Sequence, residues 1–494
     1  MKSIKVLFTL AGNIIQVLFG LVYFFLIRII FSYEVIGIYG AILSNLQAFL
    51  FIADLGFSTA HLKYYQQAEN MQEKKEFNTS FLFFRVIQIS IYSSVLLIII
   101  PFLNIHEGDT SIIYIFLLAE IFRVIGYNYL LFVLLSEKLV VKRLITLLTT
   151  SIMNIVFLYL FTFLIHSNVR TMALIYLASN LLYFTILMFF ARHVKYGKLS
   201  YKAIKLYFKF SLPFFFTTIT SIIIANIDTI LINQWYSTID VANYFTAKQI
   251  YVFYTSVLVN LAYILIPLFS ENLKTNNKEN LILVSQTQKY LNFLFIFNSL
   301  FLVLYSSTII SFLFGSNYQF TSNALTFFSF DLVLTSINYI NIIYIQSSGD
   351  TKFFAIFSTF QNLLCLLLMY LLISPDFFGL AIIGGPLALA ISNLVSQLIF
   401  RPIFYKKYQL GFYWGFFRNI GIILVIYFIQ IFINMFIQIT IINFVAFLAL
   451  DFLLFLGLNY LLKGITKDDI HFIRTTFTIK NLYQTASSEF KENE

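Results

Sequence analysis

Apolar segments of about twenty residues recur along the whole chain, and each is long enough to cross the roughly 30 Å hydrocarbon core of a bilayer as a helix. Only 11% of the 494 residues are charged and 60% are hydrophobic, whereas a soluble domain carries roughly 25% charged residues. A soluble fold is therefore excluded, and no stretch is left for a sizeable soluble domain. The sequence predicts an all-α polytopic membrane protein.

Charged residues, Pro, Gly and Asn divide the chain into about fourteen candidate transmembrane helices. Their predicted ranges are 7–30, 36–58, 79–101, 111–135, 144–165, 171–191, 210–234, 241–269, 288–313, 324–347, 353–374, 379–400, 414–437 and 440–462. We expect the first segment to be retained, because no signal-peptide cleavage site follows it. The predicted organisation is a six-helix lobe at 1–205, a second at 206–405, an extra helix pair at 406–465 and a cytoplasmic tail at 466–494.

The basic residues predict the orientation of these helices, because Lys and Arg are retained in cytoplasmic loops. If the helices alternate in direction and the N-terminus is inside, most of the 32 Lys and Arg residues fall on the cytoplasmic side. Only Arg28 and Arg170 fall at the outer side. We therefore expect a multi-pass protein of the bacterial inner membrane with both termini cytoplasmic. The net charge of +10 reflects this orientation and does not indicate nucleic-acid binding.

The two sets of six helices are similar in sequence. Ser32 and Tyr39, between the first two helices, align with Ser237 and Tyr244, between the seventh and eighth. A repeat of six helices has an even number of crossings, so both copies enter the membrane in the same direction. This predicts two lobes around an axis along the membrane normal.

Ionisable residues within membrane-spanning segments cost about 2.5–3.5 kcal/mol each and are functional candidates by default. The candidate substrate-binding or cavity residues are Arg28, Arg85, Arg123 and Lys248. The candidate coupling or gating residues are Asp54, Glu120, Asp228 and Asp331. We expect Arg418 and Asp451, in the extra helix pair, to have structural roles.

Several of these candidates also have structural explanations. Glu120 and Arg123 lie three residues apart on one helix face, where an ion pair can serve packing alone. Arg85, near the inner end of its helix, can extend its side chain to the membrane interface. Asp54 can simply mark the inner end of the predicted helix 36–58.

Asp228 and Lys248 lie inside the two helices that open the second repeat. On ideal helices both fall toward the outer half of the membrane. We predict a salt bridge between them that closes the outer side of the cavity in one state and breaks when substrate enters.

The sequence contains no motif of a known catalytic site. There is no Walker-type glycine loop, no GxSxG and no HExxH, and the five His residues are scattered. Cys365 is the single cysteine, which excludes a disulfide framework and a cysteine metal cluster. We therefore expect a protein that is not an enzyme and has no cofactor, so that any transport is driven by a gradient or by consumption of the product.

Three strings carry a resemblance to a known family. They are RIIFSYEVIGIYGAILSNLQAFLFIADLGFSTAHLKYY, then SLPFFFTTITSIIIANIDTILINQW with LIPLFSENL, then LFGSNYQFTSNAL with QSSGDTKFF. The matching positions are Gly37, Tyr39, Asp54, Leu55, Gly56, Leu212, Pro213, Asp228, Pro267, Phe269, Ser270, Phe314, Gly315, Tyr318, Gly349 and Lys352. The chain resembles the O-antigen and capsule type polysaccharide flippases of the multidrug/oligosaccharidyl-lipid/polysaccharide exporter superfamily. It departs from their pattern at Ala242, where family members usually have Gly.

The resemblance implies a flippase that moves an undecaprenyl-pyrophosphate-linked oligosaccharide, of the O-antigen, lipopolysaccharide or capsule type, from the inner to the outer leaflet by alternating access. It implies a cationic central cavity, in which Arg28, Arg85, Arg123 and Lys248 contact the anionic head. The expected partners are this lipid-linked substrate, membrane lipids, a proton or sodium gradient, a glycan polymerase and glycosyltransferases, and no nucleic acid.

Three alternatives stay open at this point. A drug/cation antiporter of the same superfamily has the same plan, but it needs an acidic cavity and typically has twelve helices. A membrane glycan polymerase or ligase usually carries a long extracytoplasmic loop, whereas the predicted outer loops here are short. A scaffold within a glycan-assembly complex has no distinguishing sequence feature.

Overall fold

The computed structural model describes most of the chain, namely residues 16, 18–102, 110–137, 139–212, 215–275, 277–315, 318–348, 350–437 and 441–466. In these residues the regular elements are all helical, which confirms the predicted all-α class. Ten of the described helices are long and apolar enough to cross a membrane. A helix overlaps each of the predicted ranges, and the count of fourteen crossings stays a prediction.

The contacts between residues divide the chain into two compact units. The described residues of the first unit fall within Ala11–Thr246 and Thr351–Ser392, and those of the second within Ala247–Asp350 and Asn393–Glu494. Each unit therefore combines segments that are distant in the sequence. The predicted lobe boundaries at 205 and 405 stay a prediction.

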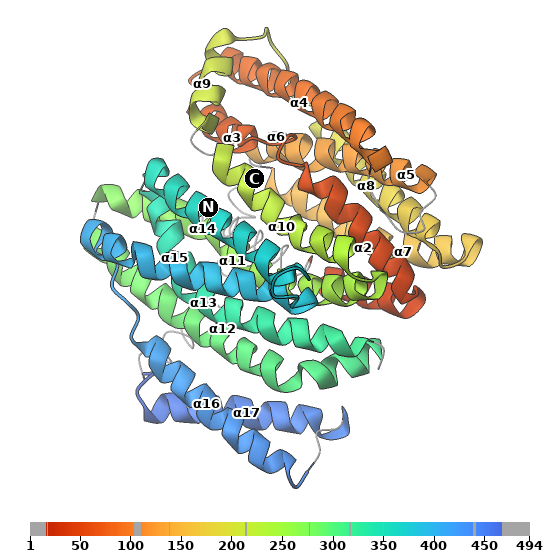
Figure 1. Ribbon diagram of the computed structural model, residues 1–494. Helices are drawn as coiled ribbons and strands as arrows, with labels where there is room; N and C mark the ends of the chain where they lie inside the picture. Colours follow the sequence, from red (N-terminus) through yellow and green to blue (C-terminus); the bar gives the residue numbers. More distant parts are fainter. Residues whose placement is uncertain are drawn as a thin grey trace. The chain divides into compact units, whose positions relative to one another are not determined.

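The first unit contains most of the helices. They are Leu18–Ile30, α2 (Tyr33–Ala48), α3 (Phe57–Gln67), α4 (Met71–Ile99), α5 (Thr110–Val124), the π-helix η2 (Ile125–Leu130), α6 (Leu131–Ser136), α7 (Val140–Ile165), α8 (Val169–Ala191), α9 (Tyr201–Ser211), α10 (Phe215–Trp235), α14 (Thr351–Ile373) and the first parts of α11 (Thr238–Thr275) and α15 (Gly384–Tyr408). The helix α8 packs against α5 and α7, and α10 packs against α2 and α14 (Figure 1). Segments from both predicted repeats thus meet within this unit.

The second unit contains the remainder of α11 and α15 together with α12 (Asn277–Phe314), α13 (Gln319–Ser347), α16 (Gly415–Asn434) and α17 (Ile441–Leu461). The helix α12 packs along α13 and also contacts α16 and α17 (Figure 1). A buried apolar core joins these helices and includes Ile296, Ile337, Ile426 and Phe455. The extra C-terminal pair is therefore built onto α12.

Two helices extend furthest beyond their predicted ranges. The helices α11 and α12 each have 38 residues. At 1.5 Å per residue that is about 57 Å, well beyond the roughly 30 Å of a hydrocarbon core. A polar stretch follows the predicted range 241–269 and precedes the predicted range 288–313. Lys, Glu, Asn and Gln can terminate a membrane segment without terminating a helix. The change from apolar to polar residues along the sequence therefore does not coincide with the end of either helix.

The predicted helix 36–58 is wrong at its C-terminal end. The helix α2 ends at Ala48, and a turn region precedes α3. In that turn the Asp54 carboxylate accepts hydrogen bonds from the backbone N–H groups of Gly56 (3.1 Å) and Ser58 (3.4 Å). Gly56 has a φ of 88°, a left-handed conformation that favours glycine. The Asp-Leu-Gly string therefore forms the turn that starts α3.

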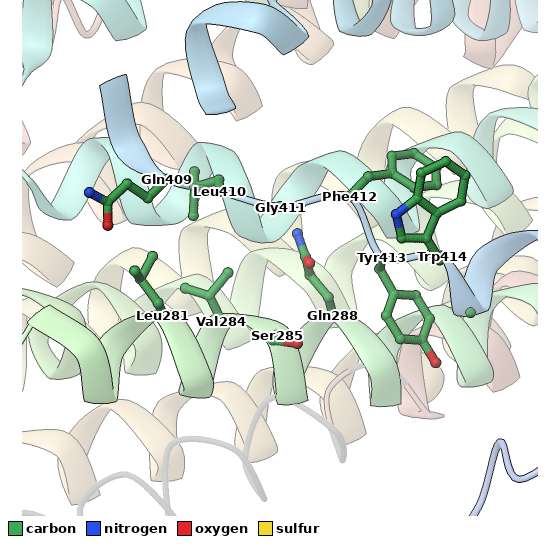
Figure 2. A pocket seen from close by; sticks show the side chains of 11 residues that line it. Leu281, Val284, Ser285, Gln288, Gln409, Leu410, Gly411, Phe412, Tyr413 and Trp414 are labelled. Carbon is green, nitrogen blue, oxygen red and sulfur yellow. The ribbon is translucent and has the colours of Figure 1, made fainter. Parts of the chain in front are cut away.

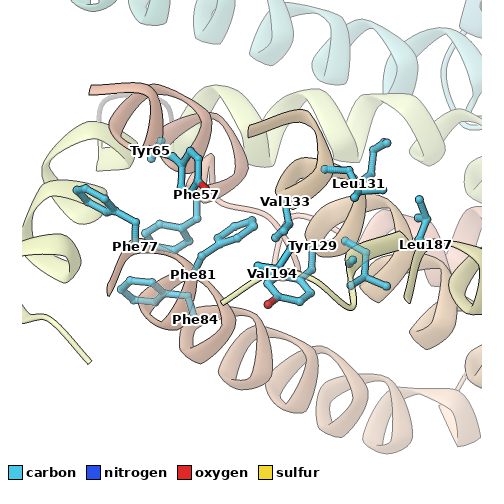
Figure 3. Close-up of a cluster of buried hydrophobic side chains, with 14 of the residues drawn as sticks. Phe57, Tyr65, Phe77, Phe81, Phe84, Tyr129, Leu131, Val133, Leu187 and Val194 are labelled. Carbon is cyan, nitrogen blue, oxygen red and sulfur yellow. The ribbon is translucent and has the colours of Figure 1, made fainter. Parts of the chain in front are cut away.

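An aromatic core packs these elements together in the first unit (Figure 3). It includes Phe57 of α3, Phe81 and Phe84 of α4, and Tyr129 of η2. The rings of Phe57 and Phe84 stack with a centroid distance of 4.5 Å. Many of the Phe residues of this chain are thus packing residues, as expected for a helical membrane protein.

The predicted orientation has a direct test. Truncated fusions to a reporter placed after Lys205 and after Glu494 are expected to report the cytoplasm, and a fusion at Asp109 is expected to report the outer side. The physical reason is the retention of Lys and Arg on the cytoplasmic side. Paired phosphatase and fluorescent-protein reporters measure both outcomes. A reversed signal at any of these sites contradicts the topology.

Candidate functional site

A buried carboxylate on α5 collects donors from three helices of the first unit. Glu120 is fully buried, and its Oε2 lies 2.7 Å from Nε of Arg123. Its Oε1 accepts hydrogen bonds from Nε2 of Gln47 on α2 (3.0 Å) and from the hydroxyl of Tyr176 on α8 (2.7 Å). We call these four residues the Glu120 centre. The predicted contact between Glu120 and Arg123 is confirmed.

The guanidinium of Arg123 keeps unused hydrogen-bonding capacity. Its Nη2 atom is buried and has no hydrogen-bond partner among the residues that the structure describes, although 25% of the side chain is exposed. Leaving a buried donor unsatisfied costs about 1–3 kcal/mol, and more for a charged group. The site therefore suits an acceptor such as an anionic oxygen.

Aromatic rings continue the Glu120 centre toward Arg28. The ring of Tyr39 on α2 meets the rings of Tyr176 and Phe245 edge to face, with centroid distances of 6.3 and 6.0 Å. The guanidinium of Arg28, which is 5% exposed, lies 6.0 Å from the centroid of the same Phe245 ring. Arg28, a predicted cavity residue like Arg123, therefore lies beside the Phe245 ring that also contacts Tyr39.

The Gly-x-Tyr string has a packing explanation in the first unit. A Cβ atom on Gly37 would overlap the backbone oxygen of Thr238, at the start of α11. A Cβ atom on Gly40 would lie 2.8 Å from the ring of Phe245. The connection between the first two helices therefore packs tightly against its aligned counterpart, and glycine permits the approach.

The second buried ion pair of this unit joins α4 to the turn before α3. Arg85 is 1% exposed, and its Nη2 lies 3.1 Å from Oδ1 of Asp54. The guanidinium also donates to the Ala53 carbonyl, to the Ser58 hydroxyl and, over 2.9 Å, to Oε1 of Gln88. The expectation that Arg85 extends to the membrane interface is wrong, because its acceptors all lie inside the unit. We call these residues the Arg85 centre.

A π-helical segment lies next to the Arg85 centre. The Ser58 hydroxyl, 2.6 Å from Oδ2 of Asp54, is also 3.1 Å from the carbonyl oxygen of Asn128 in η2. Gly126 faces the ring of Tyr183, where a Cβ atom would lie at 2.9 Å. The predicted helix 111–135 thus contains a π-turn between α5 and α6. Such turns are frequent at functional sites.

Asp228 on α10 is buried and lies beside the start of α11. Its Oδ2 accepts a hydrogen bond from the Tyr244 hydroxyl (2.6 Å), and its Oδ1 accepts from the backbone N–H of Thr229 (2.6 Å). Tyr244 is the residue that aligns with Tyr39. The two tyrosines have different partners, because Tyr244 binds Asp228 whereas the ring of Tyr39 contacts that of Tyr176. Lys248 is partly exposed on α11. Its salt bridge with Asp228 stays a prediction.

Asp331 lies in the second unit and has neutral partners. Its carboxylate accepts hydrogen bonds from Tyr251 on α11 (2.5 Å), Thr335 on α13 (3.2 Å) and Nδ2 of Asn393 on α15 (3.2 Å). Asp331 is 4% exposed, and within the described ranges no basic nitrogen lies within 4 Å of its carboxylate. The sequence alone predicted the acid but not its partners. We call these four residues the Asp331 centre.

Asp451 joins the extra helix pair to α12. It is buried on α17 and accepts hydrogen bonds from Tyr305 on α12 and Gln430 on α16. A second link runs from Nδ2 of Asn419 on α16 to Oδ1 of Asn292 on α12 (2.9 Å). These contacts support the expected structural role of Asp451.

The second unit also contains a cavity of about 330 Å³ between α12 and the connection that precedes α16 (Figure 2). Its lining residues are Leu281, Val284, Ser285, Gln288, Gln409, Leu410, Gly411, Phe412, Tyr413, Trp414 and Gly415. None of the eight predicted site residues lines this cavity.

The neutral members of these centres were not predicted from the sequence, because only ionisable residues were candidates there. The carboxylates accept hydrogen bonds from amides and hydroxyls, namely those of Gln47, Tyr176, Asn393 and Thr335. Gln47 could have been predicted as a buried polar partner, because it is a polar residue within the mostly apolar string NLQAFLF. Tyr176 carries no such signal, because tyrosine is common throughout this chain.

Comparisons with known proteins identify the family of the chain and support its fold. The family model described as polysaccharide biosynthesis protein matches residues 25–323. No curated relative matches the chain. A solved structure of the lipid II flippase MurJ in an inward closed conformation has a TM-score of 0.72 at 19% identity, and the match covers 92% of this chain and 98% of that one.

Two further solved structures have the same fold. An inward-facing multidrug resistance MATE family transporter of the MOP superfamily has a TM-score of 0.67 at 14% identity, covering 81% of this chain and 98% of that one. A MOP superfamily transporter from Pyrococcus furiosus, described as having a binding pocket of reversed polarity, has a TM-score of 0.57 at 15% identity, covering 83% of this chain and 95% of that one. The fold is thus that of multi-span flippases and transporters.

Proposed function

The chain belongs to the polysaccharide biosynthesis protein family, and on that premise we propose that it is a flippase for an undecaprenyl-pyrophosphate-linked oligosaccharide. It moves this substrate from the inner to the outer leaflet by alternating access. The glycan is a repeat unit of the O-antigen, lipopolysaccharide or capsule type. The glycosyltransferases that build the substrate and the polymerase that consumes it are its expected partners.

The Glu120 centre carries this proposal. Arg123 presents a buried Nη2 that has no hydrogen-bond partner among the described residues, while its charge is balanced by Glu120. Arg28 adds a second cation on the Phe245 ring. Two guanidinium groups thus lie beside the Tyr39 and Phe245 rings, and charge-assisted hydrogen bonds from guanidinium suit a pyrophosphate better than a cationic drug.

The remaining groups of this region suit the sugar. A glycan needs hydrogen-bonding and ring surfaces across the hydrocarbon, whereas the polyprenyl tail can stay in the lipid. Tyr39 and Tyr176 supply rings and hydroxyls beside the two arginines. Arg85 contributes less to this proposal, because its terminal nitrogens already bind protein acceptors.

We assign coupling to the Asp331 centre. A buried carboxylate held by hydroxyl and amide groups, with no basic nitrogen within 4 Å in the described part, can gain and lose a proton or a sodium ion without breaking an ion pair. Asp54 and Glu120, by contrast, already pair with arginines. Asp228 and Lys248 keep the gating role that the sequence predicts for them.

Flipping by purified protein tests the proposal. Proteoliposomes receive an undecaprenyl-pyrophosphate oligosaccharide on one side, and its exposure on the other side is measured with and without a proton or sodium gradient. We expect transfer of this substrate and much less transfer of the same oligosaccharide on an uncharged polyprenyl carrier, because the carrier lacks the anionic head. Transport of a cationic drug without flipping would establish the antiporter instead. Absence of both activities contradicts the proposal.

A further inference from the structure

The segment 192–212, which connects α8 to α10, is strongly basic, and we call it the basic linker. It contains six Lys and Arg residues and no Asp or Glu. The six are Arg192, Lys195, Lys198, Lys202, Lys205 and Lys209, and the side chains of all six are exposed. Most of its charge is therefore presented outward, although the Arg192 guanidinium lies 4.4 Å from the centroid of the Phe189 ring.

Large apolar side chains alternate with these charges on the exposed surface. Tyr201 is 79% exposed and Leu212 is 71% exposed, and Tyr196 and Leu199 are nearly half exposed. Phe208 is partly exposed, but its ring packs edge to face on Phe57 and Phe84 of the aromatic core. The opposite face of α9 is buried through Ala203, Tyr207 and Ser211, which recur every fourth residue. One face of α9 thus packs on the protein, and the other combines lysines with apolar groups.

The basic linker is attached to the rest of the first unit along its length. The backbone N–H of Gly197 donates to the Thr79 hydroxyl (2.8 Å), and Nδ2 of Asn78 donates to the carbonyl of Lys195 (3.1 Å). The Tyr207 hydroxyl lies 2.8 Å from Nδ1 of His61 on α3. The exposed face of α9 therefore has a defined orientation and does not belong to a loose loop.

The two ends of the basic linker place it at a membrane surface. It begins directly after α8, which ends at Ala191, and α10 begins at Phe215; both helices are long and apolar enough to span a bilayer. Interfacial amphipathic helices have this arrangement: their lysines stay in water, and their aromatic and leucine side chains enter the headgroup region. Anionic headgroups complement a segment that has six positive charges and no negative one.

We propose that the basic linker is a binding surface for acidic phospholipids. The lysines contact the phosphate groups, and Tyr201 and Leu212 enter the headgroup region beside them. Nearby acidic groups do not cancel this surface. Glu73 of α4 forms an exposed pair with Lys202 (3.2 Å), which leaves the other five basic residues of the linker without a carboxylate within 4 Å in the described part.

An environment-sensitive probe tests this surface in the full chain. Tyr201 is mutated to Cys in a Cys365→Ala background, labelled with NBD, and the protein is placed in nanodiscs of phosphatidylcholine with 0 to 50% phosphatidylglycerol. We expect a blue shift of the emission, and quenching by doxyl-labelled lipid, that grow with the phosphatidylglycerol content. In 1 M NaCl, where the Debye length is about 3 Å, the dependence should be largely lost. Equal emission at all lipid compositions overturns the proposal.

Two variants that each lose three lysines distinguish the effect of the basic linker from the effect of the total charge of the protein. Each lysine near an anionic surface contributes about fivefold to the affinity, so Lys198→Gln, Lys205→Gln and Lys209→Gln together lower it on the order of a hundredfold. A hundredfold loss of affinity cannot be offset by raising phosphatidylglycerol to 50%. The triple variant should therefore show no blue shift at any of these lipid compositions. The control replaces the exposed Lys352, Lys406 and Lys463 by Gln and should keep the shift. Loss in both variants overturns the proposal, and the salt response of the unsubstituted linker decides the case if the triple variant does not fold.

Discussion

Replacing Arg85 with alanine is expected to remove most of the folded protein from the membrane. Arg85 is 1% exposed and donates to the Ala53 carbonyl, Ser58 and Gln88 while it pairs with Asp54. Breaking a buried ion pair from one side costs about 3–5 kcal/mol, a large part of a typical stability of about 5–15 kcal/mol. Membrane abundance and thermal unfolding in detergent measure the loss.

The matched control for this substitution is Arg170→Ala. Arg170 is exposed at the start of α8, and its removal should change abundance and the unfolding temperature little. If Arg85→Ala is as abundant and stable as the Arg170 variant but does not export glycan, the Arg85 centre is a substrate or coupling site, and its structural assignment is wrong.

Neutralising Arg123 is expected to lower glycan export at least tenfold, toward background, at near-normal protein abundance. The Arg123 side chain is 25% exposed and keeps one buried nitrogen for a ligand, and a hydrogen bond to a charged group contributes about 1.5–3 kcal/mol. Glu120 would still accept hydrogen bonds from Gln47 and Tyr176, which limits the cost to folding. Export is measured by surface glycan and by flipping in proteoliposomes.

A double substitution distinguishes binding from packing at this centre. Glu120→Gln with Arg123→Gln removes both charges together, so no uncompensated charge is buried. If the ion pair only supports packing, this variant should have normal abundance and full export. If Arg123 binds the anionic head, it should have normal abundance and export as little glycan as the single Arg123 variant. Full export by Arg123→Ala would exclude direct head-group binding by that residue.

The two arginines show how far reasoning from the sequence reaches. Both are cations within apolar segments, Arg123 with Glu120 three residues before it, and the sequence predicted a cavity role for both. The structure separates them, because Arg85 is enclosed by four acceptors from two segments and Arg123 by one carboxylate. Three of the four acceptors of Arg85 lie about thirty residues away in the chain, where no sequence pattern indicates contact.

The local features were predictable where their cause is local. Apolar runs must form helices in a bilayer, because backbone groups have no other partner there, and a helix overlaps every predicted range. The pair Glu120–Arg123 follows from a spacing of three on one helix. The end of α2 at Ala48 was missed, because the apolar run continues past it while the Asp54 side chain forms the turn.

The sequence by itself determined the membrane class, the approximate helical segments and the candidate intramembrane charges, since each depends on the free energy of placing single residues or short segments in lipid. The tertiary structure alone decided which neutral groups complete each centre. Gln47 and Tyr176 reach Glu120 from other helices, and Asn393 reaches Asp331 from α15. These contacts depend on how helices distant in sequence pack side by side, which hydropathy and spacing along one helix do not encode.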